Sequence, residues 1–314
     1  MRKTFLSFLV LLVCVVTVHV QAQSLRYQYA QGTAPFTQLT GSTPFVLTGS
    51  LDEGYSAPVP IGFTFTYAGV AYDSFQVSTN GFIRLGSGLT SATGTNALGG
   101  VLRRVIAPLW DDLSVADSAS LSYQLSGTAP NRVLTVEWKN VKWLFSASSA
   151  NAEFQVKLYE GTNKIDFHYG TFGAVLATVT ASIGLNDHTA VTTTDQATGT
   201  FLSYQFAGDA GSRTLMATMG LEFKTVFLAP DNNTVITMTA PGAPMTGTYT
   251  VGGASPDFAT PSQAAIALNV RGVSGPVTLN IRPGSYEDVL HLTSIPGASA
   301  TNTVTVKNES GVVT

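Results

Sequence analysis

The chain contains 314 residues, with 16 Lys and Arg against 19 Asp and Glu, and its formal net charge is −3. This acidic balance argues against a nucleic-acid-binding surface. The single cysteine, Cys14, lies in the apolar N-terminal segment, so the remainder of the chain offers neither a disulfide nor a thiolate metal site. The length permits one large domain or two modest ones, held together by burial of apolar side chains.

Residues 1–22 have the pattern of a secretory signal peptide. Arg2 and Lys3 supply positive charge, the apolar run from Thr4 to Val18 is short for a bilayer span, and small residues precede a cleavage point after Ala22. Cleavage there leaves 14 basic residues against 19 acidic ones and a net charge of −5. We therefore expect a secreted or outer-surface protein whose mature chain has no membrane span.

Residues 23–228 are predicted to form short antiparallel strands. In Ile61–Tyr67 every second residue is large and apolar, which is typical of a strand with one buried face. Two more alternating runs flank Asn80-Gly81, a dipeptide that favours a tight hairpin turn. Other strands are expected at Arg103–Trp110, Leu121–Leu125, Arg132–Val141, Ala152–Glu160, Lys164–Gly170, Thr178–Asn186 and Leu221–Leu228. An antiparallel β-sandwich is the expected architecture, since this part of the chain has no clear amphipathic helix.

Several of these segments carry a family resemblance. The strings STNG, APLWDDL and FQVKLYEGTNKIDFHYG, within about Tyr27 to Phe227, resemble the nidogen-like extracellular β domains of secreted bacterial multidomain proteins. The resemblance implies an adhesion or matrix module, and hence interaction rather than catalysis.

The composition changes after the predicted sandwich. Residues 229–247 are rich in Pro, Gly, Thr and Asn, which predicts a last strand at Thr234–Thr239 and then a linker. Thr260, Pro261 and Gln263 form the start signal of a short helix, and Gly272 is its stop. Alternating runs then follow at 277–281, 290–292 and 304–306, separated by Pro-Gly turns, which favours the first coil of a right-handed parallel β-helix.

This second unit carries a resemblance of its own. The strings DFATPSQAAIALN and GPVTLNIRPGSYEDVLHL resemble the opening of pectin-lyase-like β-helices, in particular of pectinesterases. One coil cannot bury its apolar face without stacked neighbours, so we expect a chain truncated at Thr314. Glu287 and Asp288 are neighbours on an extended segment and point to opposite faces, so we interpret them as structural rather than as a catalytic carboxylate pair.

Asp111 and Asp112, with Asp117 nearby, are the candidate metal ligands, because carboxylates in a loop bind calcium. Asp52 and Glu53 form a similar but weaker acidic pair. The alternative interpretation is a polar strand end, whose carboxylates cap turns or accept backbone N–H bonds. Calcium is the one cofactor that the sequence leaves open.

Aromatic residues are the candidates for a sugar-binding platform. Trp138 alternates with apolar neighbours and is expected in the core, whereas Trp143 breaks the alternation and is predicted to be exposed and to bind ligand. Asp166 and His168 share the outward face of one strand. We interpret them as solvated positions rather than as parts of a metal site or catalytic triad, since no HExxH or GxSxG motif is present.

The predicted fold is all-β: an antiparallel sandwich over residues 23–228, a last strand and linker over 229–247, and a short capping helix with the start of a right-handed parallel β-helix over 248–314. The predicted function is non-catalytic adhesion, binding or spacing at the bacterial surface or in the matrix. An extracellular polysaccharide or a surface protein is the expected partner, and the loops Gly86–Gly100 and Ser146–Asn151 are the expected recognition elements. The alternative is a secreted carbohydrate-active enzyme of pectin-lyase fold, with catalytic coils beyond this chain.

Overall fold

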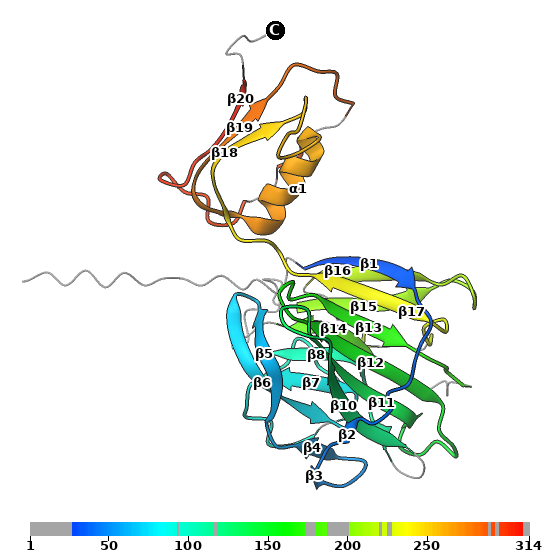
Figure 1. The fold of residues 1–314 in the computed structure, drawn as a ribbon. Helices are drawn as coiled ribbons and strands as arrows, with labels where there is room; N and C mark the ends of the chain where they lie inside the picture. Colours follow the sequence, from blue (N-terminus) through cyan, green and yellow to red (C-terminus); the bar gives the residue numbers. More distant parts are fainter. Residues whose placement is uncertain are drawn as a thin grey trace, which may run out of the picture.

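The computed structural model describes residues 27–309, except 93, 116–118, 174–179, 187–200, 220–221, 225–227, 288–289 and 293–294. Two antiparallel sheets form a sandwich, and a helix with a small parallel sheet follows it (Figure 1). The predicted all-β sandwich is therefore confirmed. The predicted signal peptide lies outside the described residues. Within the described part of the chain, no helix has the length and apolar character needed to span a membrane.

The first sheet contains the predicted meander. Its order is β1 (Gln28–Thr33), β17 (Thr234–Thr239), β13 (Ile165–Tyr169), β12 (Ala152–Tyr159), β11 (Val133–Trp143), β10 (Ser120–Ser126) and β2 (Thr43–Pro44), with β9 (Leu113–Ser114) paired to β11. The strands β10 to β13 pair in chain order, with Val136 opposite Val156 and Val156 opposite Phe167. β17 is the predicted last strand, and it joins this sheet between β1 and β13.

The second sheet contains the predicted hairpin. Its order is β16 (Thr214–Met219), β15 (Phe201–Ala207), β14 (Ser182–Asn186), β8 (Val105–Trp110), β7 (Phe82–Leu85), β6 (Val70–Ser78), β4 (Gly54–Ser56) and β3 (Leu47–Gly49), with β5 (Val59–Tyr67) paired to β6. Between β6 and β7 only Gly81 of the Asn80-Gly81 pair has a positive φ, 78°. A side chain at Gly81 would collide with the carbonyl group of Leu109, so the turn requires glycine for space as well as for conformation.

The second sheet differs from the prediction in its last part. β15 and β16 were not predicted, whereas the expected strand at Leu221–Leu228 is wrong for its residues 222–224, which lie outside any strand. The side chains of β15 are buried on both faces over most of its length, so its sequence lacks the polar alternation that marks a half-buried strand.

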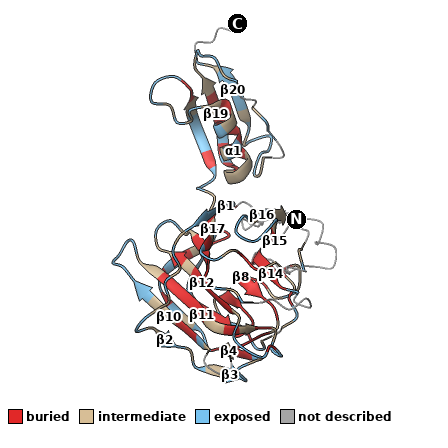
Figure 2. Cartoon of the chain, turned by 90° about the vertical axis from the view of Figure 1, so that its right-hand side faces the viewer, coloured by how far each residue is buried: buried red, intermediate tan, exposed pale blue. Residues whose placement is uncertain are grey.

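The space between the sheets is filled by one apolar cluster to which both sheets contribute (Figure 2). Two of the polar side-chain tips inside it are satisfied across the sandwich. Trp138 Nε1–H on β11 donates to the carbonyl of Ser78 on β6 at 3.0 Å, and the Tyr169 hydroxyl on β13 donates to the carbonyl of Pro108 on β8 at 2.8 Å. Both bonds join the two sheets, and they avoid the cost of burying an unpaired donor.

The outer face of the first sheet is covered, contrary to the prediction. The covering segment (residues 34–45) hydrogen-bonds to side chains that point away from the core: His168 Nε2 lies 2.9 Å from Ala34 O, and Gln155 Nε2–H donates to Thr37 O at 2.8 Å. Asp166 and His168 are only 6% and 5% exposed. Their interpretation as solvated positions is therefore wrong: the covering segment contacts His168, and the Tyr159 hydroxyl and Lys164 Nζ donate to the Asp166 carboxylate.

The second unit consists of β18 (Met245–Val251), α1 (Pro261–Arg271), β19 (Val273–Ile281) and β20 (Val304–Asn308). The helix prediction is confirmed: Thr260 Oγ1 accepts the Gln263 N–H at 3.3 Å, and Gly272 ends the helix with φ 68°. The three strands pair in parallel in chain order. β18 begins inside the predicted linker, and residues 290–292 form no strand, so both of those details were wrong.

Candidate functional site

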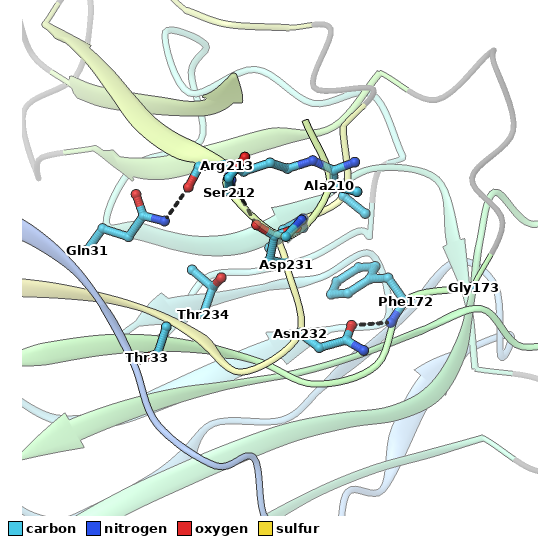
Figure 3. Close-up of a pocket in the computed structure, with 13 residues that line it drawn as sticks. Gln31, Thr33, Phe172, Gly173, Ala210, Ser212, Arg213, Asp231, Asn232 and Thr234 are labelled. Carbon is cyan, nitrogen blue, oxygen red and sulfur yellow. Dashed lines mark hydrogen bonds between the residues drawn. The ribbon is translucent and has the colours of Figure 1, made fainter. Parts of the chain in front are cut away.

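An open pocket of about 700 Å³ lies at one end of the sandwich, where the two sheets meet (Figure 3). We call it the end pocket. β1 and the start of β17 come from the first sheet, and the turn between β15 and β16 comes from the second. Its described lining consists of Gln31, Thr33, Phe172, Gly173, Ala210, Gly211, Ser212, Arg213, Ala229, Pro230, Asp231, Asn232 and Thr234.

Gln31 on β1 fixes one wall of the end pocket. Its side-chain N–H donates to the carbonyl of Arg213 at 2.8 Å, and its side-chain oxygen accepts the Leu215 N–H at 2.7 Å. The amide side chain of Gln31 thereby makes the two hydrogen bonds that the backbone of a neighbouring strand would make, and it joins the first sheet to β16 of the second sheet.

Asp231 fixes the turn that forms the opposite side. Its two carboxylate oxygens accept the backbone N–H groups of Gly211 at 2.7 Å and Arg213 at 2.9 Å. Hydrogen bonds to a carboxylate are stronger than those between neutral groups. The turn is thus held in one conformation, and the role of Asp231 is to position it.

Two further polar residues, Arg213 and Asn232, line the end pocket. Arg213 Nε is buried and has no hydrogen-bond partner within the described part of the chain. Asn232 Oδ1 accepts the Phe172 N–H at 3.4 Å, which places an amide beside an aromatic ring (Figure 3). Phe172 is supported from below by Trp143 and Tyr169, at ring-centroid distances of 5.8 and 6.1 Å. A guanidinium, an amide and an aromatic ring together suit a polar ligand with an apolar face.

The end pocket offers no catalytic pair among its described residues. Ser212 is the only lining residue with a serine hydroxyl, and this hydroxyl donates to the Asp209 carbonyl at 3.3 Å. The described lining contains no histidine or cysteine that could activate this hydroxyl. The arrangement can therefore bind and orient a ligand, but its described side chains provide no activated nucleophile.

Asp111, a predicted metal ligand, is buried and fully occupied by protein donors. Its Oδ2 accepts Trp143 Nε1–H at 2.8 Å and the Thr180 N–H at 2.9 Å, while Oδ1 accepts the Asp112 N–H at 2.9 Å and the Thr180 hydroxyl at 3.2 Å. This is the alternative interpretation, a carboxylate that accepts N–H bonds at a strand end.

Asp112 lines a separate pocket of about 420 Å³ together with Glu53 and Asp111. Burial, and then the charges of Asp52, Glu53 and Asp111, raise the pKa of the Asp112 carboxyl above its ordinary value. Within the described residues, no group of three His, Cys, Asp or Glu is placed to hold a metal ion. Asp117 lies outside those residues, so its predicted role as a calcium ligand stays untested.

Trp143 was predicted to be exposed, and this is wrong: it is 0% exposed. β11 contains a bulge between Trp138 and Val141, where Asn140 adopts a positive φ of 52°. The extra residue reverses the inward and outward alternation, so Trp143 returns to the core side. The Trp143 ring therefore lies away from the surface, and it contacts the Phe172 ring of the end pocket.

The predicted recognition loops are held to the sandwich. In the Gly86–Gly100 loop, the Leu98 N–H donates to Glu222 Oε1 at 2.6 Å, and Leu89 and Leu98 are buried. In the Ser146–Asn151 loop, Asn151 Oδ1 accepts the Trp143 N–H at 2.6 Å. Glu287 is exposed, and Asp288 lies outside the described residues.

Sequence reasoning missed Gln31, Arg213, Asp231 and Asn232 of the end pocket. The run Asp231-Asn232-Asn233 carries the one usable signal, because consecutive Asp and Asn residues favour turns whose side chains bind backbone groups. It lies in a segment that was interpreted as the approach to a linker.

Comparison with known proteins adds a family to this geometry. Residues 26–240 match the family model described as NIDO related, a stretch that includes both sheets and the end pocket. No curated protein and no solved structure matches the chain.

Proposed function

Because the chain belongs to the NIDO-related family, we propose that it is an exported, non-catalytic binding module of the bacterial surface or extracellular matrix. A domain of this family indicates an extracellular domain of binding type. The single observation that carries the proposal is the end pocket, which is shaped before any ligand arrives because Gln31 and Asp231 fix its walls.

We propose an extracellular polysaccharide as the ligand of the end pocket. The half-buried Phe172 ring contacts the apolar face of a sugar, while Arg213 and Asn232 bind its hydroxyl groups. A preformed pocket loses little conformational entropy on binding, so modest contacts suffice for a specific interaction. The volume of about 700 Å³ lies in the range that holds one or two sugar units.

The test is binding of the full chain to a panel of immobilised neutral and acidic polysaccharides, measured with three variants. Asn232→Ala and Arg213→Gln should each weaken binding roughly tenfold, the effect of losing one or two ligand hydrogen bonds. Asn131→Ala is the matched control, because Asn131 lies exposed in the β10–β11 turn. Unchanged binding by both pocket variants would disprove the assignment of the end pocket.

For residues 248–314 we propose the start of a parallel β-helix that acts as a stalk or solenoid. The support is the in-register stacking of successive strands: Gly247 pairs with Val277, and Val277 pairs with Val304. Each return of the chain to the same sheet edge adds one parallel strand, which is how coils of a solenoid grow.

A further inference from the structure

A second pocket, of about 580 Å³, lies on the outer face of the second sheet and is rich in arginine. We call it the arginine pocket. Arg84 on β7 and Tyr72 on β6 form its floor, and the loop between β7 and β8 contributes Gly88 to Ser91 and Val101 to Arg104. Arg84, Arg103 and Arg104 all line it, and its described lining contains no carboxylate.

Two of these guanidinium groups converge on one neutral acceptor. Arg84 Nη1–H donates to the carbonyl oxygen of Ser87, and Arg104 Nη2–H donates to the same oxygen at 3.2 Å. Arg84 is 9% exposed, and its buried Nε has no hydrogen-bond partner in the described part of the chain. Two like charges near one carbonyl, one of them largely removed from water, repel each other and favour a bound anion.

The wall of the arginine pocket is held by a side chain of the sheet. Gln76, which pairs with Arg84 across β6 and β7, donates to Leu89 O at 3.1 Å and accepts the Leu89 N–H at 2.7 Å. These bonds fix the loop at the point where it turns over Arg84. The donors are therefore held in place before a ligand binds.

Two glycines give the guanidinium groups room to lie along the loop. A Cβ atom at Gly86 would lie 3.1 Å from Arg104 Nη1, and one at Gly88 would lie 3.2 Å from Arg84 Nη1. Both glycines have positive φ, 74° and 99°. A side chain at either position would strain the backbone and would require the neighbouring guanidinium to shift by a few tenths of an ångström, so the glycines favour the observed placement of the charges.

We propose that the arginine pocket binds the anionic group, carboxylate or sulfate, of an acidic extracellular polysaccharide. The planar guanidinium fork matches both oxyanions in size and geometry. Val101, which is 91% exposed, and Tyr72 add an apolar border for the sugar ring that carries the charge. The inference rests on the proposed function, which names an extracellular polysaccharide as the ligand. It further specifies that this polysaccharide is negatively charged.

The sequence surrounding this pocket is unusual for an acidic chain. No Asp or Glu occurs between Asp73 and Asp111, although the whole chain has 19 acidic residues. The segment that carries the three arginines therefore contains no Asp or Glu of its own. A net negative protein needs such a local site to hold an acidic polymer.

The experiment measures the affinity of the full chain for polygalacturonate, dextran sulfate and neutral dextran at low and high salt. Arg84→Gln and Arg104→Gln should each weaken binding of the acidic polymers roughly ten- to hundredfold, the range for loss of charged hydrogen bonds. Lys224→Gln is the matched control, since it removes one positive charge from a side chain that is 58% exposed and outside the pocket. Arg104 is the less buried of the two arginines, so Arg104→Gln decides the question if Arg84→Gln does not fold.

Each outcome has a definite meaning. A preference for polygalacturonate assigns a carboxylate, and a preference for dextran sulfate assigns a sulfate. Equal loss in Lys224→Gln and Arg104→Gln, or no binding of either acidic polymer, would overturn the inference. Binding that Asn232→Ala weakens but Arg104→Gln does not would overturn it while leaving the proposed function intact.

Discussion

Asp111→Asn is expected to destabilise the sandwich strongly. Asp111 is 2% exposed, and its two carboxylate oxygens accept from Trp143 Nε1, Thr180 N, Asp112 N and the Thr180 hydroxyl. An asparagine amide has one oxygen and one NH₂ group. In either orientation the NH₂ group faces at least one N–H donor, so hydrogen bonds are lost and a repulsive contact replaces them.

The expected size follows from those contacts. A hydrogen bond to a charged group contributes about 1.5–3 kcal/mol, so the loss of two such bonds lowers the free energy of unfolding by roughly 3–6 kcal/mol. Urea unfolding followed by tryptophan fluorescence measures this, because Trp110, Trp138 and Trp143 all lie in the sandwich. Trp143→Phe removes a single donor to the carboxylate and also shrinks a buried side chain, so it should cost at least about 1.5–3 kcal/mol.

Asp112→Asn is the matched control for Asp111→Asn. It makes the same chemical change one residue away, at a group whose pKa is raised by burial and by the charges of Asp52, Glu53 and Asp111. Removing that charge relieves repulsion, so the free energy of unfolding should stay within about 0.5 kcal/mol or rise slightly. A stability of Asp111→Asn equal to that of Asp112→Asn would refute the structural role of Asp111.

Further predictions address calcium, the hairpin turn, catalysis and pH. Because the carboxylate oxygens of Asp111 are occupied by protein donors, addition of millimolar calcium or of EDTA should leave the urea midpoint of unfolding unchanged. A rise of this midpoint with calcium would support the calcium-site hypothesis. Gly81→Val should lower the free energy of unfolding by more than about 2 kcal/mol, since φ is positive and the Leu109 carbonyl occupies the space; a melt like that of wild type would contradict this. The full chain should not cleave polygalacturonate, whereas turnover that Glu287→Gln abolishes would favour the enzyme alternative. Burial lowers the pKa of His168 in the native state, so below about pH 6.5 the unfolded chain binds a proton that the native chain does not. Stability should therefore fall as the pH decreases through that value, and a His168→Gln variant with the same pH dependence as wild type would show that another group is responsible.

Sequence alternation predicted the parts of the fold in which one strand face is apolar and pairing is local. Ile61–Tyr67 and the meander of β10 to β13 satisfy this condition, and they were predicted correctly. The rule failed at Trp143 because one extra residue in β11 reverses the faces, and bulges have no reliable signature in a single sequence.

The two pockets were beyond prediction for a different reason. The end pocket joins Gln31 to Arg213 and Leu215, residues from opposite ends of the domain sequence. The arginine pocket depends on Gln76 holding Leu89, a contact between a strand and a loop. The sequence identifies the charged residues and the turn residues. Only the sheet topology shows which of these residues lie together in one pocket.

Both outer faces of the sandwich follow the same physical logic. The chain has one cysteine, Cys14 in the N-terminal apolar segment, so no disulfide holds its long connections. Instead, side chains that point outward from the strands bind the backbone of the segments above them: Gln155 holds the covering segment, and Gln76 holds the loop of the arginine pocket. A loop fixed in this way presents its remaining polar groups in one arrangement, which is what specific recognition requires. Gln76 therefore holds the loop of the proposed arginine pocket in place, and mutating it should weaken ligand binding through loss of loop order before it unfolds the core.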